Sequence, residues 1–60
     1  GLTKREIEIT QCVIEGKTNS EVAEELFISV RTVQNHLRSI YEKCEVNNRT
    51  SLSNRVLSLI

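Results

Sequence analysis

The stretch Ser20–Ser39, SEVAEELFISVRTVQNHLRS, decides how this chain folds. Its apolar residues recur at spacings of three and four, which is the periodicity of amphipathic helices. The period is interrupted between Phe27 and Ser29, so two helices joined by a short turn are expected, as in a helix-turn-helix. The small Ala23 lets the two helices approach closely. Four larger apolar residues can fix their crossing angle: Leu26, Ile28, Val33 and Leu37.

Outward from this stretch, helical periodicity continues over the whole chain, which predicts an all-α, four-helix bundle containing the helix-turn-helix. Side chains that cap helix N-termini mark where the helices begin. These are Thr3, Thr18, Ser29, and either Asn47 or Asn48. After each of the two threonines a Glu follows at the third position, which completes a capping box. The expected helices run over residues 4–15, 19–27, 30–43 and 49–59.

Length and composition limit what the chain can be. It has 60 residues, which is enough for one domain with a small core. Hydrophobic residues make up 38% and charged residues 27%, which is typical of a globular domain. No apolar run approaches the roughly 20 residues that span a bilayer, so no membrane partner is expected. We expect residues 1–60 to be a single domain, and the absence of methionine indicates a fragment of a longer protein.

Charge is balanced in total, with 8 basic and 8 acidic residues, but not along the chain. Residues 1–28 carry three basic and six acidic side chains, whereas residues 29–60 carry five basic and two acidic ones. This asymmetry is typical of an acidic body with a basic working face. An ordinary solvated surface would give the same counts, so charge alone leaves both interpretations open.

The polar side of the third expected helix, Val30–Lys43, favours binding to double-stranded DNA. Its first two and a half turns carry arginine and amide side chains, which can make bidentate contacts to guanine and adenine in the major groove. The expected base-reading residues are Arg31, Gln34, Asn35 and Arg38. The expected phosphate contacts are Thr18, Ser29, Thr32, His36, Lys43 and Arg49. For His36 an equally good interpretation is a histidine packed against the core.

The remaining reactive side chains predict neither a metal site nor catalysis. Cys12 and Cys44 are the only cysteines and His36 is the only histidine, and their spacing does not suit zinc, which needs about four ligands in local pairs. Both cysteines lie at apolar-periodic positions, so two reduced core thiols are expected. With one histidine, no aspartate and no glycine-rich loop, we expect no enzyme and no cofactor.

Three stretches resemble a known family: LTKREIEI at residues 2–9, EGKTNSEVAEELFISVRTVQNHL at residues 15–37 and YEKCEVNNRTSL at residues 41–52. Together they are similar to the LuxR-type (GerE/FixJ-like) helix-turn-helix DNA-binding domain, the C-terminal output module of many bacterial transcription regulators, including response regulators. The resemblance implies transcriptional regulation in the cytoplasm, at the nucleoid when the domain is bound. It also implies RNA polymerase and an upstream sensor or receiver domain as further partners.

The resemblance implies roles for single residues as well. The base-facing positions of the family fall on Gln34, Asn35 and Arg38. The fourth helix of the family commonly supports dimerisation on DNA, which implies a homodimer on paired half-sites. Its expected interface residues are Ser53, Leu57 and Ile60. Glu6 matches a family carboxylate that we expect to cap the first helix or to pair with a base such as Arg49.

The chain departs from the family pattern at two positions. Glu45 replaces the glycine that normally ends the third helix in a left-handed conformation, which costs about 1 kcal/mol unless the cap geometry changes. Thr10 stands where the family often has an apolar residue. Two alternatives remain open, a helical protein-interaction module that uses Ile7 and Ile14 on the outer side of the first helix, and a promoter-reading domain like that of a sigma factor.

Overall fold

Four helices make up the computed structural model, which describes residues 1–58. They are α1 (Lys4–Ile14), α2 (Asn19–Leu26), α3 (Val30–Cys44) and α4 (Arg49–Ser58), and no strand occurs in the described part. The all-α prediction is confirmed, and each helix begins at the predicted residue. The predicted ends of the first three helices are wrong by one residue each, and the predicted end of the fourth at residue 59 lies outside the described residues.

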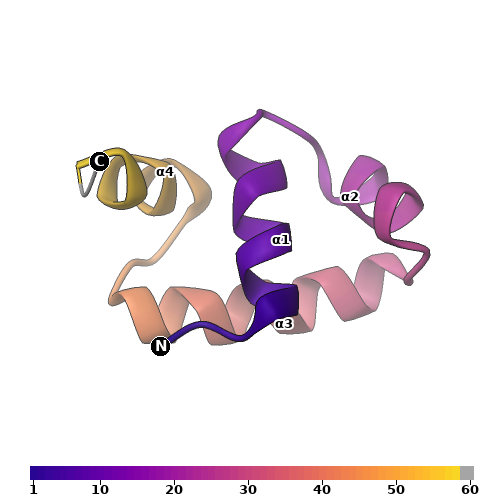
Figure 1. Cartoon of the computed structure of the whole chain (residues 1–60), viewed down its shortest axis with the longest axis horizontal. Coiled ribbons are helices and arrows are strands. Elements are labelled where there is room, and N and C mark those ends of the chain that lie inside the picture. Colours follow the sequence, from indigo (N-terminus) through magenta and orange to yellow (C-terminus); the bar gives the residue numbers. More distant parts are fainter. Residues whose placement is uncertain (59–60) are drawn as a thin grey trace.

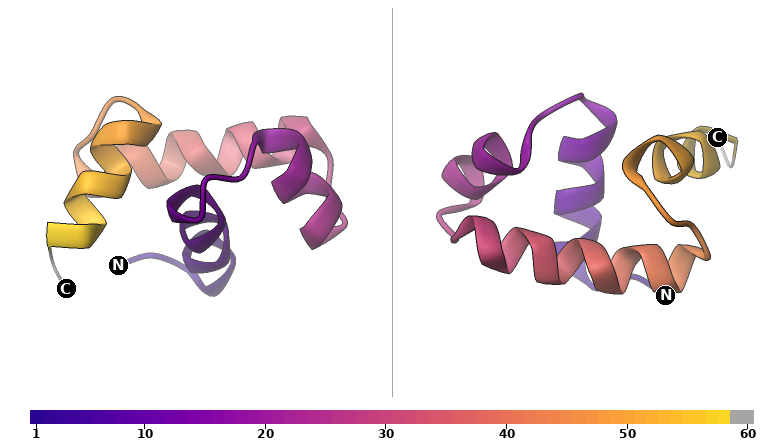
Figure 2. Two further views of the ribbon diagram at one scale, coloured as in Figure 1. Left: turned by 90° about the horizontal axis from the view of Figure 1, so that it is seen from above. Right: turned by 180° about the vertical axis from the view of Figure 1, so that it is seen from behind.

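The longest helix, α3, runs along one side of the molecule, and α1 crosses it (Figure 1). α2 and α4 lie on either side of α1, with α2 near the beginning of α3 and α4 near its end (Figures 1 and 2). The molecule measures 29 × 19 × 19 Å. This arrangement leaves the side of α3 that is turned away from the other three helices open to solvent.

Side-chain caps hold the N-termini as predicted. Both capping boxes form, with Thr3 Oγ1 accepting from the Glu6 N–H at 3.2 Å and Glu6 Oε1 accepting from the Thr3 N–H at 2.8 Å. Thr18 and Glu21 repeat the same pair of bonds at 3.2 and 2.8 Å. At the start of α4 the sequence left two asparagines open, and the structure selects Asn48, whose Oδ1 accepts from the Ser51 N–H at 2.8 Å.

Two helices end on non-glycine residues in the left-handed region. Glu45 ends α3 with φ 57° and ψ 45°, so it adopts the conformation of the glycine that it replaces. Its N–H donates to the Glu42 carbonyl at 3.2 Å. Phe27 ends α2 in the same way, with φ 57° and ψ 44°, which its residue type does not indicate.

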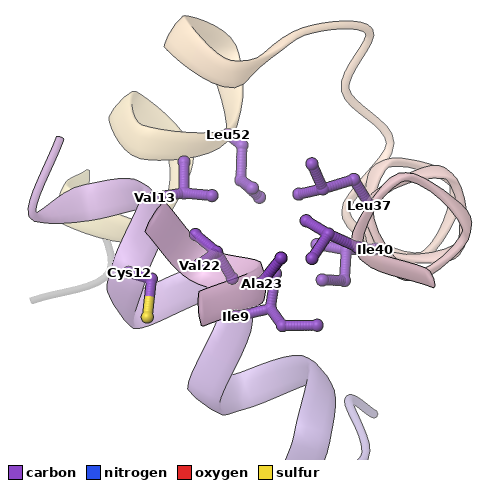
Figure 3. Close-up of a cluster of buried hydrophobic side chains, with 9 residues drawn as sticks. Ile9, Cys12, Val13, Val22, Ala23, Leu37, Ile40 and Leu52 are labelled. Carbon is purple, nitrogen blue, oxygen red and sulfur yellow. The ribbon is translucent and has the colours of Figure 1, made fainter. Parts of the chain in front are cut away.

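One hydrophobic core joins all four helices (Figure 3). Leu52 reaches from α4 into the space between α1 and α3, where it is fully buried. The buried apolar side chains are Ile9, Cys12, Val13, Val22, Ala23, Val33, Leu37, Ile40 and Leu52. Thr10 is also buried. Its hydroxyl donates to the Glu6 carbonyl at 2.8 Å, so the buried polar group has a hydrogen-bond partner without water. This bond explains how a polar side chain is accommodated beside the core.

Candidate nucleic-acid interface

The predicted base-reading residues share one exposed face of α3. Side chains three and four residues apart lie on the same side of a helix. Arg31, Gln34, Asn35 and Arg38 follow this spacing, and all four are exposed. The opposite side of α3 carries Val33, Leu37 and Ile40, which are buried in the core. The burial of one side therefore determines which side chains remain free to meet a ligand.

The chemistry of this face suits the edges of base pairs. Guanidinium groups are fixed forks of donors, and side-chain amides offer a donor and an acceptor together. An α-helix fits the major groove of B-DNA, where each base pair presents a distinct pattern of donors and acceptors. The first carboxylate along the face is Glu42, which is exposed one turn after Arg38. The stretch Arg31–Arg38 is therefore free of negative charge.

An open hollow of about 690 Å³ adjoins this face on the side of α2 and of the loop before α4. It is lined by Asn19, Gln34, Leu37, Arg38, Tyr41, Glu42, Glu45, Val46 and Asn47. Asn19 was not among the predicted site residues, although it directly follows the capping Thr18. The structure places it on the lining of the same hollow as Gln34 and Arg38, although it lies on another helix.

The predicted phosphate contacts at the helix starts are exposed, but their hydroxyls already act as caps. Thr18 Oγ1 accepts from the Glu21 N–H, and Ser29 Oγ accepts from the Thr32 N–H at 3.1 Å. The Ser29 and Thr32 hydroxyls lie 2.8 Å apart and share a hydrogen bond. A hydroxyl that accepts one bond can still donate its own hydrogen. Thr18 therefore keeps a donor for a phosphate oxygen.

Lys43 lies on the flank of α3 that faces the start of α1. Its ammonium is 2.7 Å from Glu6 Oε1, and the other Glu6 oxygen accepts from the Ser39 hydroxyl at 2.8 Å. Lys43, the Thr3 backbone N–H and Ser39 lower the pKa of the Glu6 carboxyl from 4.5 to about 2. The prediction that Glu6 caps the first helix is confirmed. Glu6 also pairs with a base, the other role that the sequence left open, and that base is Lys43 rather than Arg49.

Arg49 is half-buried and ties α4 to the beginning of α2. One guanidinium nitrogen donates to Asn19 Oδ1 at 2.6 Å, and the other donates to the Lys17 carbonyl oxygen. These two bonds use two of the five guanidinium N–H donors. In the structure Arg49 therefore positions α4 against the beginning of α2, a role separate from the phosphate contact that the sequence predicts.

The other predicted residues lie outside the exposed row of α3. His36 is half-buried on α3, between the exposed row and the core. On α4, Ser53 is half-buried and Leu57 is 54% exposed, whereas Ile60 lies outside the described residues. α4 stands at the far end of α3 from α2 (Figure 1). The expected dimer residues that are described are thus separate from the N-terminal half of α3.

Acidic groups on α1 and α2 are arranged around Lys17. Its ammonium is 2.7 Å from Glu25 and 3.1 Å from Glu15, and these carboxylates raise the pKa of Lys17. The Cys12 thiol donates to the other Glu25 oxygen at 3.0 Å. Burial and this carboxylate raise the pKa of Cys12 to about 11. Cys12 is therefore a protonated, unreactive thiol.

Both cysteines are free thiols, as predicted, although only Cys12 is buried and Cys44 is half-buried. Within residues 1–58, no group of three or more potential metal ligands comes together. In the same part of the chain, no helix is long and apolar enough to cross a membrane.

Comparison with known proteins gives consistent matches over nearly the whole chain. A family model described as bacterial regulatory proteins, luxR family, matches residues 1–56. The transcriptional regulatory protein LiaR of Bacillus subtilis (strain 168) is 53% identical over 49 residues, which are 82% of this chain and 23% of LiaR. The match shows that the chain spans about a quarter of the length of that regulator.

Two solved structures have the same fold. The response regulator ChrA of a heme-sensing two-component system superposes with a TM-score of 0.94 at 42% identity, over 98% of this chain and 29% of that one. The DNA-binding domain of the response regulator ComA, solved in complex with the anti-activator RapF, superposes with a TM-score of 0.89 at 40% identity. That match covers 92% of this chain and 95% of the ComA domain.

Proposed function

The chain belongs to the luxR family of bacterial regulatory proteins, and on this premise we propose that it binds double-stranded DNA with sequence preference to regulate transcription. In this proposal α3 enters the major groove with its N-terminal half. The observation that carries the proposal is the row of four exposed side chains from Arg31 to Arg38, which is free of carboxylates.

Each side chain of the row has a role that follows from its chemistry. Arg31 and Arg38 donate two parallel bonds to the O6 and N7 atoms of guanine. Gln34 and Asn35 pair with the N6 and N7 atoms of adenine. Because these four residues span two turns of helix, they read only a few successive base pairs. A single domain with so few contacts binds weakly, which favours two domains on paired half-sites.

Phosphate contacts flank the row on both sides. The N-termini of α2 and α3, at Thr18 and Ser29, offer backbone N–H groups and helix dipoles to phosphate oxygens. Lys43 and Arg49 supply positive charge, and Thr32 and His36 supply further hydrogen bonds. These contacts fix the register of α3 but carry no sequence information.

The proposal extends to the surroundings of the domain. Residues 1–60 form one domain of a longer cytoplasmic regulator that lies at the nucleoid when it is bound to DNA. A receiver or sensor domain upstream controls pairing, as the match to part of the response regulator ChrA suggests. Ser53, Leu57 and Ile60 contribute to a homodimer on DNA, and RNA polymerase is a further partner.

The test is selection of binding sites from random duplex DNA at two salt concentrations, with Asn35→Ala and Arg38→Ala beside the unchanged chain. Asn54→Ala and Arg55→Ala, which alter exposed residues of the same types on α4, are the matched controls. We expect a paired motif whose preference relaxes at defined base pairs in the two α3 variants. Each lost bidentate contact weakens binding by about 1–3 kcal/mol, or roughly 5- to 150-fold.

Either of two results would contradict the proposal. The first is no enrichment above a background that disappears with salt, which is the behaviour of non-specific phosphate binding. The second is a motif that survives both α3 substitutions unchanged, because the bases would then be read by another part of the chain.

A further inference from the structure

Asn19, the first residue of α2, is held by Arg49 of α4 through its side-chain amide. One guanidinium nitrogen of Arg49 donates to Asn19 Oδ1 at 2.6 Å, and the other donates to the Lys17 carbonyl oxygen. Because a guanidinium group can only donate hydrogen bonds, the amide atom that faces it must be the oxygen. Arg49 therefore fixes which way the amide is turned, and the two N–H donors of Asn19 are left for another acceptor.

The Asn19 side chain lines the same open hollow as Gln34 and Arg38, two residues of the exposed row of α3. It is half-buried, so a ligand can reach it. Among residues 1–58, the Asn19 amide nitrogen has no acceptor, since the bond from Arg49 uses only the oxygen. The carboxylates of the hollow, Glu42 and Glu45, come four and seven residues after Arg38, at the end of α3. An anionic ligand is therefore expected nearer Arg38 than the end of α3.

A phosphate oxygen of DNA is the acceptor that suits this position. In a helix-turn-helix the second helix lies in the major groove while the first crosses the DNA backbone. Here α2 is that first helix, and Asn19 lies at its start. Side-chain amides are common donors to phosphate oxygens, and such contacts fix the position of a protein on the duplex.

We propose that the Asn19 amide donates to a DNA phosphate and that Arg49 is the positioning residue that orients it. The inference rests on the proposed function, because it adds a contact to the same interface. It gives Arg49 a role that positive charge alone does not supply. A lysine would carry the same charge, but it lacks the rigid fork of donors that holds two acceptors in a fixed geometry.

The first test is Asn19→Asp, which keeps the oxygen that Arg49 binds but has no N–H to donate. Fluorescence anisotropy measures the Kd of the chain for a selected duplex and for a duplex of random sequence. We expect at least about tenfold weaker binding of both duplexes, because a hydrogen bond to a charged group is lost. The selected motif should stay the same, since phosphate contacts carry no sequence information. Asn54→Asp, the same change at an exposed residue of α4, should bind as the unchanged chain, and thermal denaturation checks that both variants fold.

Variants without a carboxylate test the positioning role. Asn19→Ala and Arg49→Lys should each weaken binding by about fivefold. If Arg49 acts through Asn19, then Arg49→Lys should cause little further loss in a chain that already carries Asn19→Ala. The side-chain amide resonances of Asn19 in a nitrogen-15-labelled chain give a second readout. They should shift when the random duplex is added, and this response should be lost in Arg49→Lys.

Three results would overturn the proposal: equal affinities of Asn19→Asp and Asn54→Asp, losses from Asn19→Ala and Arg49→Lys that multiply in the double variant, or a selected motif that changes in Asn19→Asp. Failure of the proposed sequence preference is seen separately, as a selection that yields no motif. The random duplex then still decides the Asn19 contact, since that contact needs no particular sequence. An unchanged chain that binds neither duplex would overturn both proposals.

Discussion

Phe27 and Glu45 each end a helix with a φ of 57°. In this conformation the Cβ atom of a side chain crowds the backbone, and glycine avoids the clash because it has no Cβ. Both residues are exposed, so no packing compensates for this conformation. The backbone hydrogen bonds are what hold it, since the N–H groups of Ile28 and Val46 close the two caps at 3.0 and 2.9 Å. In a domain of this size, each strained residue is a measurable part of a small free energy of unfolding.

Replacing either residue with glycine should therefore stabilise the fold. We expect Glu45→Gly and Phe27→Gly to raise the free energy of unfolding by about 1 kcal/mol each. For a chain of this length that corresponds to roughly 4–8 °C in Tm. Thermal denaturation followed by circular dichroism measures the change. Glu45→Ala is the control, because it removes the same side chain but cannot relax the backbone, and an equal gain from alanine would exclude strain as the cause.

At the scale of the helix, the two sides of α3 show how much of the site the sequence could predict. The spacing of Val33, Leu37 and Ile40 identified the buried side, and the remaining positions then formed the exposed row. The spacing of apolar residues along one helix is a local property, so it can be recognised in the sequence without knowing which helices pack against it. The ends of the helices were less accurate because hydrogen bonding in the last turn depends on residues beyond the periodic stretch.

The start of α4 allows a test of helix capping, because two adjacent asparagines precede the helix and only the Asn48 side chain bonds its first turn. We expect Asn48→Ala to lower the free energy of unfolding by about 1 kcal/mol and to reduce the helicity of α4. Asn47→Ala, its matched neighbour, should change stability little. Urea denaturation of the two variants provides the comparison, and equal losses would show that the Asn48 side chain is not the cap.

At the scale of the whole molecule, Glu6 connects the start of α1 to the last turns of α3 through Ser39 and Lys43. The pKa of this carboxyl is about 2 in the fold against a usual value of 4.5. Between these two values the unfolded chain binds a proton that the folded chain does not. The stabilisation is therefore complete above pH 4.5 and is lost as the pH falls toward 2.

This linkage predicts the acid behaviour of the domain. Urea midpoints of the unchanged chain should fall from pH 5 to pH 2, and Glu6→Gln should fall less over that range although it is less stable at pH 7. Lys43→Met removes the largest cause of the shift and should also flatten the curve. Glu21 and Glu25, whose pKa values are lowered as well, leave a residual slope in every variant. A Glu6→Gln curve parallel to that of the unchanged chain would exclude Glu6 as a source of the acid sensitivity.

The sequence by itself determined four helices, their starting residues, the capping boxes and the exposed row of α3. All of these depend on interactions within a few residues along the chain. Only the tertiary structure decided that Lys43 rather than Arg49 pairs with Glu6, because Glu6 and Lys43 are 37 positions apart in the sequence. It alone also placed Asn19 on the hollow that adjoins the reading face, and bonded Arg49 to the beginning of α2 and to the loop before it. Such contacts depend on how the helices cross, and that geometry is set by the shapes of buried side chains rather than by their spacing.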